Sequence, residues 1–184
     1  GNVIAGRIAN RLNLGGTNCT VDAACASSLS AMKMAISDLL EYRSDMMIAG
    51  GVDADNSPLM YMCFSKTPAF TKGDNPRPFD ENSGGVMIGE GMGMVVLKRL
   101  EDAERDGDSI YAVIKGIGTS SDGKFKSIYA PRSGGQAKAL RKAYADADID
   151  RLSIGLLEAH GTGTAAGDAA EFDGLKEVFT EDTP

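Results

Sequence analysis

One cysteine of this chain stands where a reactive side chain is useful. Cys25 lies in the stretch Val21–Leu29 (VDAACASSL), between an apolar run and a long helical pattern. A thiol at such a strand-to-helix turn faces the free N–H groups of the helix, and the helix dipole favours the thiolate, which is the nucleophilic form. We therefore predict that Cys25 is a nucleophile. The alternative is a buried core cysteine, and this is how we interpret Cys19 and Cys63.

The single histidine, His160, follows a predicted buried strand and opens a loop of small residues, His160–Thr164 (HGTGT). Such loops let a substrate approach the backbone closely, and strand ends of open α/β sheets face ligand-binding crevices. A packed core has no need of this loop, so we interpret His160 as functional rather than as a structural strand cap. Asp168 and Glu171 follow at helical spacing, where carboxylates favour the helix dipole or act electrostatically on the site.

Composition excludes several classes of function. The 184 residues carry a net charge of −7, and no basic cluster offers a nucleic-acid surface. No apolar run approaches the ~20 residues of a membrane span. The three cysteines have neither disulfide nor metal spacing, so we expect no metal site and a reducing, cytoplasmic setting. Because the chain begins at Gly1, inside a predicted helix, we expect it to be a piece of a longer polypeptide.

The periodicity of apolar residues predicts an α/β protein. Helical spacing predicts helices over 3–14, 27–42, 133–147 and 169–179, with a helical turn over 101–106. Short apolar runs predict strands over 17–23, 45–50, 94–100, 110–119 and 153–159. This alternation favours layers with a mixed or parallel sheet. Residues 52–93 are rich in turn residues and predict one long functional loop.

Several motifs resemble those of one enzyme family in order along the chain. Val21–Leu29 resembles the nucleophile motif of β-ketoacyl synthases, the condensing enzymes of fatty acid and polyketide synthesis. Other family-like segments are Ala49–Val52, Pro78–Asp80, Gly89–Gly91, Leu97–Leu100, Gln136 with its helix, and Glu158–Thr164 through Gly167 and Asp168 to Glu171. The sequence around Cys25, with Asp53–Asn56 and Phe64–Pro68, looks most like the synthase domain of bacterial polyunsaturated fatty acid synthases.

The resemblance implies a thiolase-like fold, layered α-β-α-β-α, with two similar halves and usually a homodimer. The pattern of strand, reactive residue, turn and helix indeed occurs twice, at Cys25 and at His160. By resemblance, residues 1–184 are a partial synthase domain: about 1–120 are the later part of the first half, and about 121–184 begin the second half.

The resemblance also implies a mechanism. Cys25 would take an acyl group from the phosphopantetheine arm of an acyl carrier protein, and malonyl-carrier protein would then be decarboxylated. His160 would stabilise the enolate oxygen, while Thr162 and Thr164 would bind the pantetheine arm. Glu171 would orient a family lysine, and Asp168 would support the site. No cofactor would be bound by the domain itself.

Two parts of the family's site have no counterpart here, namely a second histidine in a Gly-His motif and a Gly-Ser-Xaa-Lys lysine. We therefore expect this chain alone to be inactive. Two alternatives stay open: a thiolase-type condensing enzyme, including a Cys–His–Asn starter synthase, or a non-catalytic partner subunit that binds carrier protein or forms heterodimers.

Overall fold

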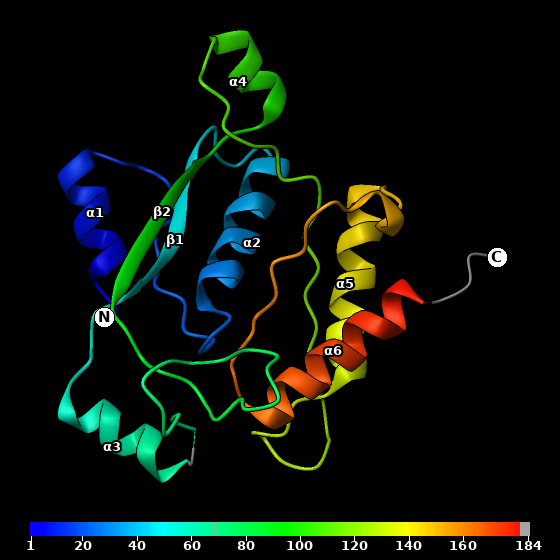
Figure 1. The fold of residues 1–184 in the computed structure, drawn as a ribbon. Coiled ribbons are helices and arrows are strands. Elements are labelled where there is room, and N and C mark those ends of the chain that lie inside the picture. Colours follow the sequence, from blue (N-terminus) through cyan, green and yellow to red (C-terminus); the bar gives the residue numbers. More distant parts are fainter. Residues whose placement is uncertain (68, 181–184) are drawn as a thin grey trace. The chain divides into compact units, whose positions relative to one another are not determined.

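The chain forms two compact units in the computed structural model, which describes residues 1–67 and 69–180 (Figure 1). Unit 1 comprises Gly1–Asp55 and Gly89–Val113, and unit 2 comprises Asn56–Ile88 and Ile114–Pro184. Pro68, which ends one of the family-like segments, lies outside the described residues.

Unit 1 is built on a two-stranded antiparallel sheet with a helix packed on it. Its elements are α1 (Ile4–Leu12), α2 (Ser27–Leu40), β1 (Met47–Asp53), β2 (Gly91–Leu97) and α4 (Leu100–Asp106). Met47 pairs with Leu97, and Asp53 pairs with Gly91. Helix α2 packs closely on β1, because a methyl group placed on Gly51 would lie only 2.9 Å from Ser28 Cβ. The start of α2 is thereby held against the sheet.

Unit 2 is built on a pair of packed helices. Its elements are α3 (Pro58–Lys66), α5 (Ser133–Ala147), a 3₁₀ turn η1 (Arg151–Ser153) and α6 (Ala165–Phe179). Val178 and Ala137 are buried where α5 and α6 pack together. An extended segment before α5 lies along that helix, where Ile117 N donates to Asp146 Oδ2 at 2.8 Å and Lys142 Nζ donates to Thr119 O at 3.1 Å.

The predicted helices are confirmed, with small shifts at their ends, and so are the predicted strands at 45–50 and 94–100. The prediction of one irregular loop over 52–93 is wrong at its two ends, which belong to β1 and β2, and at residues 58–66, which form α3. The start of α3 has a clear local signal that the prediction missed: the Ser57 side chain accepts a hydrogen bond from Met60 N, and Pro58 occupies the first turn.

Three predicted strands are not formed within the described part of the chain: 17–23, 110–119 and 153–159. A strand exists only through a ladder of hydrogen bonds to a neighbour, and the described sheet contains β1 and β2 alone. The apolar residues of these segments therefore remain at the surface, with Tyr111 99% and Leu156 89% exposed. The described sheet is antiparallel, so it contains no parallel pair of the kind that the alternation favoured.

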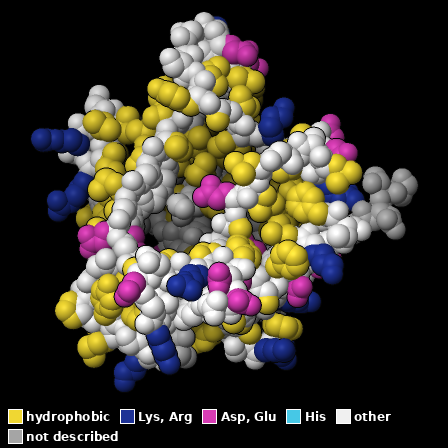
Figure 2. Space-filling view, viewed as in Figure 1, with side chains coloured by type: hydrophobic (Ala, Val, Ile, Leu, Met, Phe, Trp, Pro, Cys, Tyr) yellow, Lys and Arg dark blue, Asp and Glu magenta, His cyan; other side chains and the backbone are white. Residues whose placement is uncertain are grey.

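The interpretation of Cys19 and Cys63 as core cysteines is wrong, because both are exposed. Cys19 lies in an irregular segment, and α3, which carries Cys63, has no buried residue. Hydrophobic side chains reach the surface widely on the visible face of the molecule (Figure 2). In the residues that the structure describes, none of the helices combines the length and apolar character that crossing a bilayer requires.

Arg99 closes the C-terminal end of the helix that begins after Cys25. Its guanidinium donates to Leu39 O and Ser44 O, each at 2.8 Å, and lies 4.5 Å from the centre of the Tyr42 ring. It also pairs with Asp102, and its side chain is only 9% exposed. A planar fork of donors can serve several acceptors at fixed angles, which a lysine cannot do.

We predict that Arg99→Lys lowers the thermal midpoint by about 5 °C or more, since the carbonyl groups of Leu39 in α2 and of Ser44 beyond it lose their donor while they stay shielded from water. The measurement is thermal unfolding followed by circular dichroism. Arg105→Lys is the matched control, because the Arg105 side chain is 64% exposed and its ion pairs contribute little. Equal midpoints for the two variants would contradict the role given to Arg99.

Candidate functional site

Cys25 sits in a tight turn directly ahead of α2. Ala24 adopts a left-handed backbone conformation with φ of 51°, and Cys25 itself is exposed. The Ser27 hydroxyl holds the turn, because it accepts from Ala23 N at 2.8 Å and donates to Ala24 O at 2.7 Å. The buried-core alternative for Cys25 is therefore wrong in this structure.

The start of α2 leaves its dipole open towards this turn. The residue before the helix, Ala26, has no side chain that could cap it, and no side-chain hydrogen bond caps the helix start. Backbone N–H groups at an uncapped helix start favour an anion such as a thiolate. Exposure does not single out Cys25, however, since all three cysteines are exposed. What distinguishes it is the turn and the helix that follows.

The His160–Thr164 loop of unit 2 depends on two glycines. Gly161 and Gly163 have φ of 54° and 72°, a region that other residues rarely adopt. His160 is exposed, whereas Gly163 is buried. His160 does not cap a strand, because the segment before it forms no strand among the described residues.

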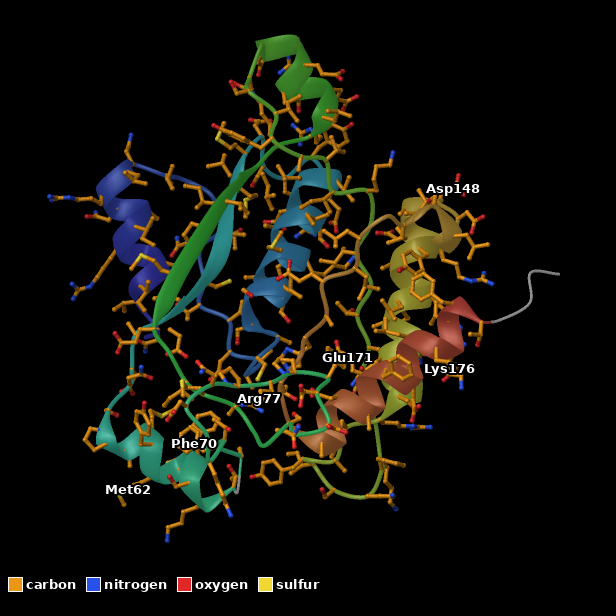
Figure 3. All side chains as sticks on the ribbon, viewed as in Figure 1. Met62, Phe70, Arg77, Asp148, Glu171 and Lys176 are labelled. Carbon is orange, nitrogen blue, oxygen red and sulfur yellow. The ribbon has the colours of Figure 1, made fainter. Side chains whose placement is uncertain are left out.

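Two carboxylates on the first turns of α6 hold this loop through its backbone. Glu171, labelled on α6 in Figure 3, accepts from His160 N at 2.6 Å and from Gly161 N at 2.9 Å. Asp168 accepts from Gly163 N at 3.0 Å and is only 6% exposed. Hydrogen bonds from backbone N–H groups to carboxylates are short and strong, so they fix where the loop runs. Both oxygens of Glu171 are engaged in this way.

The hydroxyl groups of the two loop threonines lie 3.0 Å apart. Thr164 is the N-cap of α6: its Oγ1 accepts from Gly167 N at 3.1 Å. The backbone of Gly167 passes so close that any side chain there would overlap both hydroxyl groups. Thr162 and Thr164 are thus brought together at the helix start. The sequence predicted that this helix begins at residue 169 and not at Ala165, because Thr164 was not recognised as its N-cap.

A turn from a distant part of the sequence completes this site. Asp168 Oδ2 also accepts from Phe79 N at 2.7 Å and from Ser83 Oγ at 3.1 Å. Gly85 N donates to Gly163 O at 2.7 Å. The pKa of Asp80, between these residues, is lowered chiefly by the hydrogen bond from the Asn82 backbone. The turn and the His160 loop are therefore one hydrogen-bonded assembly.

The structure brings together five of the six predicted site residues in unit 2, and Cys25 belongs to unit 1. Sequence reasoning assigned no role to Phe79 or Ser83. No local signal could have done so, since their bonds to Asp168 span 89 and 85 residues. In residues 1–67 and 69–180, no group of three or more His, Cys, Asp or Glu side chains is placed to hold a metal ion.

Comparison with known families matches both parts of the chain. Residues 1–103 match "Beta-ketoacyl synthase, N-terminal domain", and residues 111–184 match "Beta-ketoacyl synthase, C-terminal domain". A polyunsaturated fatty acid synthase polypeptide of a Thraustochytrium species is 54% identical over 97% of the chain. The polyketide synthase PksM of Bacillus subtilis is 41% identical over 98% of the chain. The chain spans only 6% and 4% of these two proteins.

Two solved structures share this fold. The ketosynthase from module 6 of the bacillaene synthase of Bacillus subtilis has a TM-score of 0.93 and is 40% identical, covering 97% of this chain and 32% of its own. The PfaC keto synthase-chain length factor also has a TM-score of 0.93 and is 43% identical, covering 96% of this chain and 19% of its own. This likeness confirms the predicted α/β fold of the thiolase type.

We predict that the two α6 carboxylates protect different amides from hydrogen exchange. Asp168→Asn should speed exchange at Phe79 and Gly163 about tenfold, because a neutral amide is a weaker acceptor than a carboxylate. Glu171→Gln, the matched variant, should do so at His160 and Gly161. The measurement is amide exchange followed by NMR or by mass spectrometry of short peptides. Equal changes at all four amides in both variants would contradict this assignment.

Proposed function

The chain belongs to the β-ketoacyl synthase family, and from that premise we propose that it supplies the nucleophilic cysteine and one histidine of a decarboxylative condensation. The product would be a β-ketoacyl thioester in polyunsaturated fatty acid or polyketide synthesis. The synthase names of the relatives support this choice.

The first half of the proposed reaction is acyl transfer to Cys25. The thiolate attacks the carbonyl carbon of an acyl thioester, and the pantetheine thiolate leaves. The Cys25 backbone N–H is one donor to the oxyanion of the tetrahedral intermediate, which is the charge that a synthase must stabilise. The observation that carries this proposal is the turn before α2, where left-handed Ala24 precedes an exposed Cys25 at an uncapped helix start.

The second half is the condensation itself. The malonyl group loses carbon dioxide, and the electron pair of the broken C–C bond forms an enolate. The His160 imidazole donates a hydrogen bond to the enolate oxygen. The enolate carbon then attacks the Cys25 thioester and expels the thiolate. The held backbone of the His160 loop supports this role, because a donor must be fixed before charge develops.

The substrates would arrive on acyl carrier protein domains, whose pantetheine arm Thr162 and Thr164 would bind. No cofactor is required of the domain itself, and the full protein would act as a homodimer. The sequence contains one histidine, so the second histidine of this mechanism would come from residues outside the chain. Activity is therefore to be measured in the full protein that carries these residues.

We predict that an acyl-pantetheine thioester acylates Cys25 and that Cys25→Ala abolishes this product. Peptide mass spectrometry locates the added acyl group. Cys19→Ala and Cys63→Ala are matched controls, because these cysteines are also exposed. Both variants should leave the acylation of Cys25 unchanged. Equal acylation of all three cysteines, or none of Cys25, would contradict the nucleophile and favour a non-catalytic partner subunit.

We predict that His160→Ala separates the two halves of the reaction. Acylation of Cys25 should persist within about twofold, whereas carbon dioxide release from malonyl-carrier protein should fall about 100-fold, the usual effect of removing one donor to a developing oxyanion. Both rates are measured on the same preparation. If decarboxylation stayed at the wild-type rate, His160 would have no role in it.

A further inference from the structure

Phe79 has a backbone conformation that its residue type rarely adopts. Five non-glycine residues of the described chain have positive φ, and three of them lie at helix ends, where this is common: Asn13, Tyr42 and Asp148. The other two are Ala24, with φ of 51°, and Phe79, with φ of 62°. Ala24 adjoins Cys25, and Phe79 shares the carboxylate of Asp168 with the loop of His160. Such backbone strain persists only where the surroundings enforce it, and it gathers at functional sites.

The surroundings that enforce it are known for Phe79. Its amide donates to Asp168 at 2.7 Å, and the Ser83 hydroxyl donates to the same carboxylate oxygen. Asp168 is buried and also accepts from Gly163 N at 3.0 Å. One carboxylate therefore sets the backbone of Phe79 and of the His160 loop together.

This conformation places a bulky apolar ring near Gly161 of the loop and leaves the ring half exposed. A methyl group placed on Gly161 would lie 3.6 Å from Phe79 Cε2 and 3.2 Å from Pro78 Cβ. Phe79 is still 47% exposed. The ring is therefore close to Gly161, next to His160, and is accessible to a ligand that passes this glycine.

We propose that Phe79 is a specificity-determining residue of the thioester site, whose ring contacts the pantetheine arm of the substrate beside Thr162, and that Asp168 positions it. This inference rests on the proposed function. An arm that lies along His160–Thr164 passes Gly161, and the ring flanks that path. The ring then favours long pantetheine thioesters over truncated ones through apolar contact.

The test uses Phe79→Gly in the full protein. Glycine accepts a positive φ without strain, so this variant removes the ring while the turn stays folded. We expect the KM for acyl-pantetheine thioesters to rise about tenfold with kcat nearly unchanged, as loss of one apolar contact implies. The KM for acyl-N-acetylcysteamine, which lacks most of the arm, should change less than twofold. Phe79→Tyr keeps the ring and should restore the difference in KM between long and truncated thioesters that Phe79→Gly removes.

Two outcomes overturn the inference and are distinguishable. Equal changes of KM for long and truncated thioesters, or no change for either, would show that the Phe79 ring does not contact the pantetheine arm. Acylation of Cys25 in the wild-type protein would then still support the proposed function. If no cysteine of the wild-type protein were acylated, the proposed function would fail, and this inference would fail with it. Asp168→Asn serves as the second variant: it should shift the same KM ratio in the same direction.

Discussion

The hydrogen bonds from backbone N–H groups to two carboxylates on α6 are the interaction on which the candidate site of unit 2 depends. Asp168 and Glu171 stand one helical turn apart and accept four amides from two separate segments, one around Phe79 and one from His160 to Gly163. Each of these segments is irregular, so no ladder of backbone hydrogen bonds fixes its conformation. The helix supplies what a sheet would otherwise supply, and the negative groups in its first turns also suit its dipole.

The two proposed catalytic residues are prepared in related ways. Cys25 follows a left-handed alanine ahead of α2, and His160 precedes a left-handed glycine ahead of α6. In each place the reactive side chain lies beside a sharp turn, and side-chain hydrogen bonds secure the turn: Ser27 does so for the cysteine and Glu171 for the histidine. Acyl transfer needs reactive groups that are exposed yet fixed, and a secured turn provides both.

Local sequence signals predicted most of the helices and named the candidate reactive positions, and the prediction of structure failed where order depends on distant partners. The apolar spacing of 133–147 was sufficient for α5, and the β1 and β2 regions were found from short apolar runs. Residues 110–119 and 153–159 have equally good strand patterns, yet they form no ladder among the described residues. A pattern of side chains shows which face of a segment is apolar. It does not provide the neighbouring strand whose hydrogen bonds are needed to form a sheet.

The sequence by itself determined which residues are the candidates for the chemistry: a cysteine ahead of a helix, a single histidine in a glycine-threonine loop, and two carboxylates at helical spacing. Their residue types and order along the chain were enough to indicate the family. Only the tertiary structure decided what these carboxylates hold, that Thr164 caps the start of α6, and that Phe79 and Ser83 belong to the site. The reason is physical: hydrogen bonds that span 89 and 85 residues leave no periodic trace in the sequence, because only the folded chain brings their donors and acceptors together.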